Sequence, residues 1–235
     1  MTAIRVIVSG AFRAAYLALV PAFEQTSGHK VTTVFGGSMG SAPTAIPARL
    51  RNGEAADLVI LAADALHPLI EQGLIRAGSR VDLVRSGLGV AVRAGAAVPD
   101  IGSVEAFKRT LLAARSIAFS TSASGVYVSE LFRRLGIADA IRSRLKQVQG
   151  EPVGAVVARG DAEIGFQQVS ELKPVSGIEL VGPLAAELQT HAIFSAAIPA
   201  HAQQPEAAQA LVAYMTSDAA APTIRESGLE PLSPS

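Results

Sequence analysis

Apolar residues recur along this chain in two alternating patterns. Short runs rich in Val and Ile have the length of buried strands, and longer segments repeat apolar residues every three or four positions, as amphipathic helices do. In the first third of the chain the strand-like segments are residues 4–9, 30–36 and 56–63. The helix-like segments that follow them are residues 11–28, about 42–52 and 65–75. This order predicts a parallel sheet with helices on both faces.

The ends of these helices carry expected signals. Gly28 and Gly53 follow the first two helical segments, where glycine commonly ends a helix. Asp64 precedes the third segment, and Asp is a good N-cap residue. We therefore expect Asp64 to cap the helix that begins at residue 65.

The pattern changes near residue 80, where residues 81–95 form one longer strand-like segment. A second α/β series follows it. Its strand-like segments are residues 116–121, 162–172, 177–184 and 190–198. Its helical segments are residues 104–114, 125–136 and 153–160, with at least one more in 205–228.

Two α/β series joined by long strands predict two lobes with a ligand cleft between them. We expect lobe I to comprise residues 1–83 and 195–235, and lobe II residues 84–194. The crossing strands are expected near residues 81–92 and 190–198.

Composition narrows the possible functions. The 20 Lys and Arg residues equal the 20 Asp and Glu residues, which argues against a nucleic-acid-binding surface but not against a site for one small anion. There is no cysteine, so disulfides, thiolate zinc sites and cysteine nucleophiles are excluded. The four histidines lie far apart in the sequence, and none has metal-ligand spacing. We expect no metal and no cofactor.

The apolar N-terminus resembles a secretion signal in composition only. Arg5 and Arg13 interrupt it, and no cleavage-site pattern follows, so residues 4–9 fit a buried strand better. No uncharged run is long enough to span a membrane. We expect a cytoplasmic protein as the sequence stands, or a periplasmic one if Met1 replaces a removed signal.

Three junctions between a strand and the next helix combine serine with glycine. They are residues 8–12, 36–41 and 120–127. The first N–H groups of a helix have no partner within the helix and attract negative charge, glycine allows close approach, and serine adds a neutral donor. The three junctions together predict an anion site. The alternative is that these residues are ordinary caps and turn residues.

Better-known glycine motifs do not match. The phosphate loop requires a Lys after its second glycine, and the dinucleotide motif requires G-x-G-x-x-G; neither occurs here. Residues 36–40 do match G-x-S-x-G, the nucleophile motif of serine hydrolases, for which Asp161 and His191 would be the partners. A five-residue match within a glycine-rich loop is weak support for a hydrolase.

Several motifs carry a resemblance to a known family. They are "VIVSGAFRAAYLALVPAFEQTSGHKVTTVFGGSMG", "IPARLRNGEAADLVILAAD", "VRSGLGVAV", "TSASG" and "GDAEIGF". In these the chain resembles the molybdate-binding proteins of the type II periplasmic binding-protein fold, over nearly its whole length. The resemblance implies an α/β fold of two lobes, each a mixed, mostly parallel sheet flanked by helices. It also implies two crossing strands, and hinge closure over an anion held by neutral hydroxyls and backbone N–H groups.

The resemblance places ligand contacts at Ser9, at Ser38, in the loop from Thr121 to Ser124, and at the helix start near Val153. With their neighbours, the predicted ligand-binding residues are Ser9, Gly10, Gly37, Ser38, Met39, Arg85, Ser86, Thr121, Ser122, Ala123, Ser124, Val153, Gln167 and Gln168.

Three departures from the family pattern bear on the ligand. Gln167 and Gln168 follow "EIGF", where molybdate-type binders usually have a tyrosine, and the third loop lacks its usual proline. Arg85 stands where an uncharged Asn is more usual. Arginine binds carboxylates in a bidentate manner, so these departures favour an organic acid over molybdate. The alternative is that Arg85 is a solvated residue of the hinge.

Two functions remain open. One is a monomeric solute-binding protein for a small anion, whose implied partner is an ABC permease; a sensory domain would look the same. The other is a cofactor-independent isomerase of a small unsaturated polycarboxylate, because some relatives of this architecture resemble aconitate isomerase. An allylic proton shift needs a base, for which Glu151, Glu171 and Tyr127 are candidates, and no catalytic residue is assigned.

Overall fold

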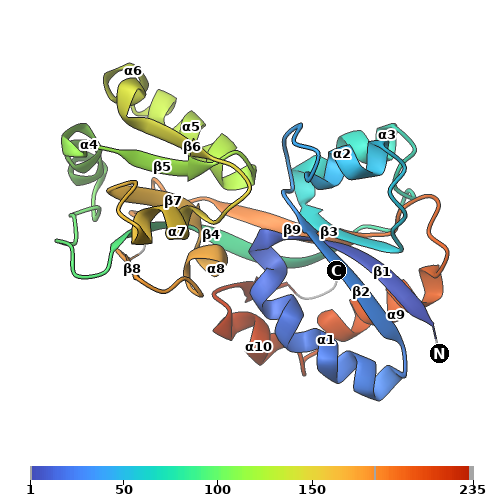
Figure 1. Ribbon diagram of the computed structural model, residues 1–235. Helices are drawn as coiled ribbons and strands as arrows, with labels where there is room; N and C mark the ends of the chain where they lie inside the picture. The colour runs from blue at the N-terminus through green and yellow to red at the C-terminus, as the bar shows by residue number, and fades with distance from the viewer. Residues whose placement is uncertain (1, 183, 233–235) are drawn as a thin grey trace. The chain divides into compact units, whose positions relative to one another are not determined.

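The computed structural model describes residues 2–182 and 184–232, and the chain divides into two compact units (Figure 1). Unit 1 comprises Met1–Ser86 and Ala192–Ser235, and unit 2 comprises Gly87–His191. Three parts of the predictions lie outside the described residues. They are Met1, on which the predicted location depends, Pro183 of the predicted strand 177–184, and the last three residues of predicted lobe I.

The sheet of unit 1 is mostly parallel. Strand β1 pairs in parallel with β2 and β3, and β9 pairs antiparallel with β3, which gives the order β2-β1-β3-β9. The carboxyl ends of β1, β2 and β3 therefore meet at one edge of the sheet. Their bounds are β1 (Ala3–Ser9), β2 (Lys30–Gly36), β3 (Leu58–Ala62) and β9 (His191–Ala197).

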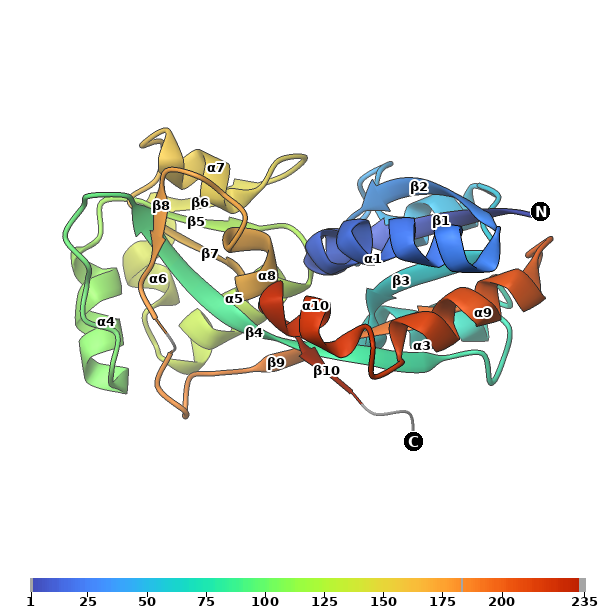
Figure 2. The ribbon, with the colours of Figure 1, turned by 90° about the horizontal axis from the view of Figure 1, so that it is seen from below.

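Helices cover both faces of this sheet (Figure 2). On one face α1 contacts α9 and α10, and Phe23 of α1 packs against Tyr214 of α9. On the other, apolar side chains of α2 and α3 pack on β1 and β3. The bounds are α1 (Arg13–Ser27), α2 (Ile46–Arg51), α3 (Leu66–Glu71), α9 (Pro205–Met215) and α10 (Ala221–Glu226).

Two predictions for the helices of unit 1 need correction. The helix predicted from about residue 42 begins at Ile46, because the Ile46 N–H donates to the Gly37 carbonyl and closes the preceding residues into a loop. Asp64 is not the N-cap of α3. It lies inside a 3-10 turn, η2 (Ala63–Ala65), which leaves Ala65 at the cap position without a side-chain cap.

Gly28 ends α1 as predicted. It adopts the left-handed conformation with φ 72°, and its N–H donates to the Glu24 carbonyl. Glycine has no Cβ to clash in this conformation, which is why it commonly terminates helices. The turn brings the chain directly into β2.

Unit 2 has a second sheet. Strand β5 pairs in parallel with β6 and β7, while β4 pairs antiparallel with β7 and with β8. Strand β4 (Val81–Arg93) begins in unit 1, where β10 (Glu230–Pro231) pairs with it, and ends in unit 2. The remaining bounds are β5 (Ile117–Ser120), β6 (Leu145–Val148), β7 (Ile164–Gln168) and β8 (Ile178–Leu180).

The helices of unit 2 also lie on both faces of its sheet. Helices α4 and α5 pack against one face, and α7 packs against the other. The helices and turns are η1 (Gly10–Phe12) in unit 1, and α4 (Val104–Ala113), α5 (Ala123–Arg134), α6 (Ala138–Ile141), η3 (Arg142–Arg144), α7 (Val153–Ala158) and α8 (Val169–Leu172) in unit 2.

Two segments of unit 2 differ from expectation. The predicted strand 162–172 ends at Gln168, and its last residues form α8. Strand β6 was not expected, because Lys146 and Gln147 are exposed and only Val148 of the strand is buried. Such an edge strand lacks the apolar run that identifies a central strand.

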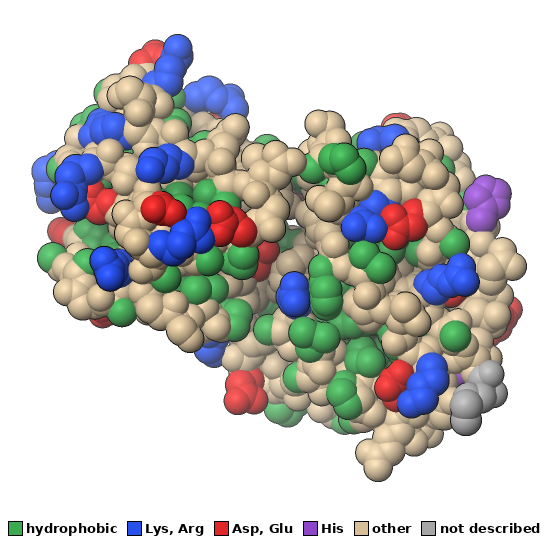
Figure 3. Space-filling view, viewed as in Figure 1, with side chains coloured by type: hydrophobic (Ala, Val, Ile, Leu, Met, Phe, Trp, Pro, Cys, Tyr) green, Lys and Arg blue, Asp and Glu red, His purple; other side chains and the backbone are tan. Residues whose placement is uncertain are grey.

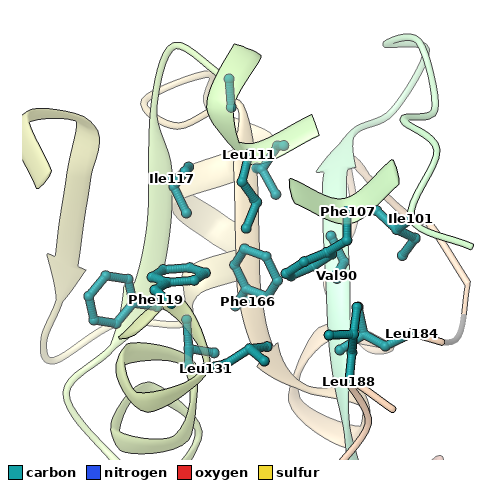
Figure 4. Packing of buried hydrophobic residues seen from close by; sticks show 14 of the residues in the cluster. Val90, Ile101, Phe107, Leu111, Ile117, Phe119, Leu131, Phe166, Leu184 and Leu188 are labelled. Atoms are coloured by element: carbon teal, nitrogen blue, oxygen red, sulfur yellow. The ribbon is translucent and has the colours of Figure 1, made fainter. Parts of the chain in front are cut away.

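The core of unit 2 is built around a fully buried Phe166 on β7 (Figure 4). Phe107 of α4 and Phe132 of α5 contact it edge to face, with ring centroids 5.9 and 5.8 Å away. Burying one such side chain stabilises the fold by about 1.5–3 kcal/mol. On the opposite face Gly165 lets α7 approach, since a Cβ there would lie 2.5 Å from Val157.

Each unit thus has a mixed sheet with helices on both faces, which confirms the predicted α/β fold class. In unit 2 the pairings of β5 are parallel and those of β4 are antiparallel, so that sheet is not mostly parallel. Figure 3 shows that basic and acidic side chains are interspersed on the visible face of each unit. Within the described residues, no helix is both long and apolar enough to cross a membrane.

Candidate anion-binding loops

In unit 1 the ends of three strands are joined through one serine. Ser38 follows β2 and is fully buried. Its Oγ accepts a hydrogen bond from the N–H of Ala62, the last residue of β3, at 3.0 Å. The same hydroxyl donates to the Oγ of Ser9, the last residue of β1, at 2.8 Å. Parallel pairing of the three strands brings these groups together.

These hydrogen bonds run in one direction. The Ala62 N–H donates to Ser38, Ser38 donates to Ser9, and the Ser9 hydroxyl keeps its own proton to donate onward. Hydrogen bonds in series polarise one another, so the last donor is strengthened. Ser9 can therefore present a fixed, neutral donor at the carboxyl end of β1.

The loop after β2 is compact. The Gly37 carbonyl accepts from the Ile46 N–H at 2.9 Å, and the Gly36 Cα faces the Thr44 carbonyl so closely that a Cβ would lie 2.4 Å from that oxygen. Gly40 has φ 95°, a conformation that favours glycine. Met39 is partly buried and Gly40 is exposed. The predicted Gly10 is partly buried at the start of η1.

In unit 2, β5 ends at Ser120 and α5 begins at Ala123. The Oγ of Ser120 accepts from the Ser122 N–H at 3.2 Å and shares a hydrogen bond of 2.9 Å with the Oγ of Ser124. The first helical bond runs from the Val126 N–H to the Ser122 carbonyl. The N–H groups of Ala123 and Ser124 precede it and are the donors that a helix start leaves for an anion.

Gly125 holds this helix against the strand end. A Cβ at this position would lie 1.6 Å from the Ser120 carbonyl oxygen. Only glycine allows the first turn of α5 to pack so closely on the strand it follows. Thr121 is exposed between them, and its N–H donates to the Val148 carbonyl at the end of β6.

The helix start at Val153 already has a partner inside unit 2. The Val153 N–H donates to Oε1 of Gln167 at 2.8 Å, and both residues are buried. The side chain of Gln167 also hydrogen-bonds to Glu171 on α8, as does the backbone N–H of Gln168. One amide thus links the start of α7 to a carboxyl group.

Burial raises the pKa of the Glu171 carboxyl to about 7, because a charged carboxylate loses hydration there. The hydrogen bonds from Gln167 and Gln168 act in the opposite direction but do not cancel the effect. A carboxyl with such a pKa exchanges its proton readily near neutral pH.

The other two candidate bases are bound differently. Both carboxylate oxygens of Glu151 bind Arg159, at 2.6 and 3.0 Å, and these hydrogen bonds lower the pKa of Glu151. The Tyr127 hydroxyl donates its proton to the Leu188 carbonyl at 2.7 Å. Both groups are thus already engaged, Glu151 by a cation and the Tyr127 hydroxyl by a backbone carbonyl.

Arg85 lies on β4 opposite Glu230 of β10, and its Nε donates to the Glu230 carboxylate at 2.6 Å. The side chain is about half exposed. Its predicted role with a ligand carboxylate stays a prediction. The neighbouring Ser86 is buried, as is Gln168 in unit 2.

The hydrolase alternative lacks its geometry. Ser38 is buried, accepts from Ala62 and donates to Ser9, whereas a nucleophile in this motif is exposed on a turn that leads straight into a helix. Asp161 accepts from Arg159 at 2.8 Å. Within residues 2–182 and 184–232, no three His, Asp or Glu side chains are arranged to hold a metal ion.

The structure brings together two pairs of predicted residues, Ser9 with Ser38 and Val153 with Gln167. The predicted ligand-binding residues did not include Ala62 or Ser120, although Ser120 lies in the predicted junction 120–127, and the link from Gln167 to Glu171 was not expected. Ser120 had a visible signal, since it lies at the end of the strand that leads into the serine-rich loop. The backbone of Ala62 had none.

A family model described as "Bacterial extracellular solute-binding protein" matches residues 4–230. The chain belongs to this family. Aconitate isomerase of Pseudomonas sp is 44% identical over 233 residues, which cover 99% of this chain and 89% of that protein. The molybdate-binding protein ModA of Azotobacter vinelandii is 30% identical over 239 residues, covering 96% of this chain and 88% of that protein.

The fold is also similar to that of solved structures. The sulfate-binding protein SubI of Mycobacterium tuberculosis superposes with a TM-score of 0.78 at 18% identity, covering 99% of this chain and 88% of that one. The predicted resemblance to molybdate-binding proteins, and to aconitate isomerase among their relatives, is thereby confirmed.

Proposed function

We propose that this solute-binding-family protein binds a small organic polycarboxylate. The observation that carries the proposal is the hydrogen-bond series from Ala62 through Ser38 to Ser9, which ends in a fixed neutral donor. Neutral donors bind an anion without a counter-charge, because backbone and hydroxyl dipoles replace its hydration. Family membership supports an anionic solute, and the molybdate- and sulfate-binding relatives are similar in fold.

Two features favour an organic acid over a metal oxyanion. Gln167 and Gln168 occupy the positions where a tyrosine was expected in a molybdate binder. The relative with 44% identity over nearly the whole chain is named for an organic acid, aconitate. We infer that the donors of unit 1 serve this ligand.

A thermal-shift panel tests the ligand class. Citrate, trans-aconitate and phthalate are compared with molybdate, tungstate and sulfate at equal concentrations. A ligand at 100 times its Kd stabilises the native state by about 2.7 kcal/mol, a shift of several degrees in Tm. We expect this shift with at least one carboxylate. A large shift with molybdate and none with any carboxylate would overturn the proposal.

Single variants test the donors of each unit separately. Ser9→Ala in unit 1 removes the terminal hydroxyl donor, and Ser122→Pro in unit 2 perturbs the start of α5. Each is expected to weaken carboxylate binding about tenfold or more in calorimetry. Ser41→Ala, in the exposed part of the loop after β2, is the matched control. Normal affinity in a test variant would show that its donor does not bind the carboxylate.

A second function, isomerisation of an unsaturated polycarboxylate, is favoured by the carboxyl of Glu171 and by the 44% identical isomerase. Such a reaction moves a proton between two carbons and needs only a base and a site for the carboxylates. Ultraviolet absorbance during incubation with trans-aconitate measures it. A steady change that scales with enzyme concentration supports catalysis, and a constant absorbance supports binding alone.

The two functions differ in where the protein would act. A transport receptor works outside the cytoplasm and delivers its solute to an ABC permease, as the family description implies. An isomerase needs no permease. Fractionation of cells that express the native gene, with the protein followed by antibody, separates the two, because only a transport receptor must appear in the extracytoplasmic fraction.

A further inference from the structure

We propose that Glu171 is the catalytic residue that removes and returns the substrate proton. This inference rests on the isomerase function proposed above and deepens it by naming the group that carries out the chemistry. It stands on the hydrogen-bonding partners of the three candidate bases and on the position of α8.

The candidates separate by what their polar atoms already bind. Glu151 is held by Arg159 through both carboxylate oxygens. Tyr127 donates its hydroxyl proton to a backbone carbonyl. Among the described residues, the hydrogen-bond partners of Glu171 are uncharged: the Gln167 amide and the Gln168 N–H. These partners orient the carboxylate. They do not hold it in the charged state, whereas an arginine would.

The position of Glu171 ties it to a predicted ligand contact. Helix α8 follows β7 directly and packs against α7, so the carboxyl lies at the carboxyl end of a strand. Gln167 bonds to Glu171 and to the first N–H of α7 at Val153. The same amide therefore fixes the distance between the carboxyl group and the helix start at which the family resemblance places the ligand.

The chemistry balances without a further reactant. The carboxylate of Glu171 takes a proton from the CH₂ group next to the double bond, and the C–H electron pair spreads over three carbons. The proton returns to the carbon at the other end, so the double bond moves by one position. Glu171 ends as the carboxylate that it was at the start. No oxidant, metal or cofactor enters this step.

The electrostatic surroundings suit this role. Burial is the first cause of the raised pKa of Glu171, and no charged group of the described residues contributes to it. Helix α8 packs against α7, β7 and the second half of β4. The charged residues in or next to these elements are Arg93, Glu151, Arg159, Glu163 and Lys173. Glu151 pairs with Arg159, and Glu163 pairs with Arg115. Both ion pairs lie within unit 2.

Glu171→Gln in the full chain is the direct test, with Glu179→Gln on the exposed β8 as the matched control. We expect Glu171→Gln to lower kcat for trans-aconitate about 10²- to 10⁴-fold, the usual contribution of a general base. Its Kd for citrate should stay within about threefold, because the amide conserves shape and hydrogen bonding. In D₂O the wild type should exchange the CH₂ protons of the substrate, as followed by NMR, and Glu171→Gln should not.

The pH profile supplies a readout that a structural role would not change. With Glu171 as base, kcat/KM of the wild type rises with pH through an apparent pKa near 7, and this limb is lost in Glu171→Gln. Glu171→Asp keeps the carboxyl but shortens its reach, so it should keep the limb with a lower kcat. If Glu171→Gln does not fold, Glu171→Asp decides, and an unchanged kcat overturns the inference.

Failure of the inference and failure of the proposed function look different. If the wild type neither turns over trans-aconitate nor exchanges its protons, the isomerase function is wrong and the inference falls with it. If the wild type is active and Glu171→Gln is equally active, only the assignment of Glu171 is overturned. If Glu171→Gln loses citrate binding and turnover in parallel, Glu171 is a binding residue, which also overturns the assignment.

Discussion

The strand-end loops of unit 1 and the β7–α8 region of unit 2 use different chemistry. In unit 1, Ser9 and Ser38 are joined by uncharged hydrogen bonds that begin at a backbone N–H. In unit 2, Gln167 joins a backbone N–H to Glu171, a carboxyl with a pKa near 7. The first arrangement offers neutral donors alone, whereas the second also contains a group that can exchange a proton. The two units thus differ in the chemistry that their polar residues can support.

The largest effect on stability is expected from an alanine substitution at Gly125 in unit 2, and the same substitution at Gly36 in unit 1 compares the rigidity of the two strand-end junctions. In Gly125→Ala the new Cβ would lie 1.6 Å from the Ser120 carbonyl, and both atoms belong to a packed helix–strand junction. We expect a loss of about 3 kcal/mol or more in the free energy of unfolding, measured by urea denaturation. Gly36→Ala places its Cβ 2.4 Å from the Thr44 carbonyl, which lies in a loop that can shift, so it should cost less.

The control for both variants is Gly102→Ala, whose new Cβ would have its nearest neighbour 3.5 Å away, at a side-chain oxygen of Asp100. A change within about 0.5 kcal/mol is expected there. If Gly36→Ala proved more damaging than Gly125→Ala, the junction of unit 1 would be the more rigid of the two, and the comparison would be reversed.

Removal of one hydroxyl should distinguish the two serine pairs. Ser38→Ala leaves the buried N–H of Ala62 without its acceptor, which costs about 1–3 kcal/mol of stability. In Ser124→Ala the Ser120 hydroxyl keeps its bond from the Ser122 N–H, so the loss should stay below about 1 kcal/mol. Chemical denaturation of both variants measures the difference. Equal losses would contradict the one-directional series in unit 1.

The stability of unit 2 should depend on pH through Glu171. The pKa of Glu171 is raised from 4.5 to about 7, so the native state binds more protons than the unfolded state between these values. Stability therefore falls as pH rises through this window. Relative to Glu171→Gln, the free energy of unfolding of the wild type should fall by about 2 kcal/mol between about pH 5 and pH 8. This value is smaller than the full shift implies, because solvent reaches part of the side chain. Denaturation curves at several pH values measure it, and parallel curves for the two proteins would contradict the raised pKa.

The smallest effect is expected at Arg85. Exposed ion pairs contribute less than about 1 kcal/mol, so Arg85→Ala should change stability little. Arg85→Ala also tests the ligand role predicted for this residue. Calorimetry with citrate measures the affinity, and Arg80→Ala, which removes a neighbouring pair with Asp82, is the control. A tenfold loss of affinity would support the ligand role, and a change below about twofold would mean that the guanidinium serves only its pair with Glu230.

The fold was predictable because its signals are local. Residues 4–9 and 56–63 are apolar enough to identify buried strands, and Gly28 marks a helix end through its own backbone preference. The errors also have local causes. Strand β6 is hidden by its exposed Lys146 and Gln147, and the start of α2 depends on a hydrogen bond to Gly37 that no propensity encodes.

The candidate site was predictable only in its outline. Serine and glycine at strand ends indicated which loops could meet an anion, and Ser9 and Ser38 are in contact although 29 residues separate them. The sequence offered Glu151 and Glu171 as equivalent bases. They differ because Arg159 lies beside one carboxyl and the Gln167 amide beside the other.

By itself, the sequence determined the alternation of strands and helices, the absence of cysteine chemistry and the family, since these follow from residue types and their spacing. Only the tertiary structure decided that Ser38 donates to Ser9, that Arg159 binds the Glu151 carboxylate, and that burial raises the pKa of Glu171. The physical reason is that hydrogen-bond direction and pKa depend on burial and on partners. Strand register and helix packing, not spacing along the chain, bring those partners together.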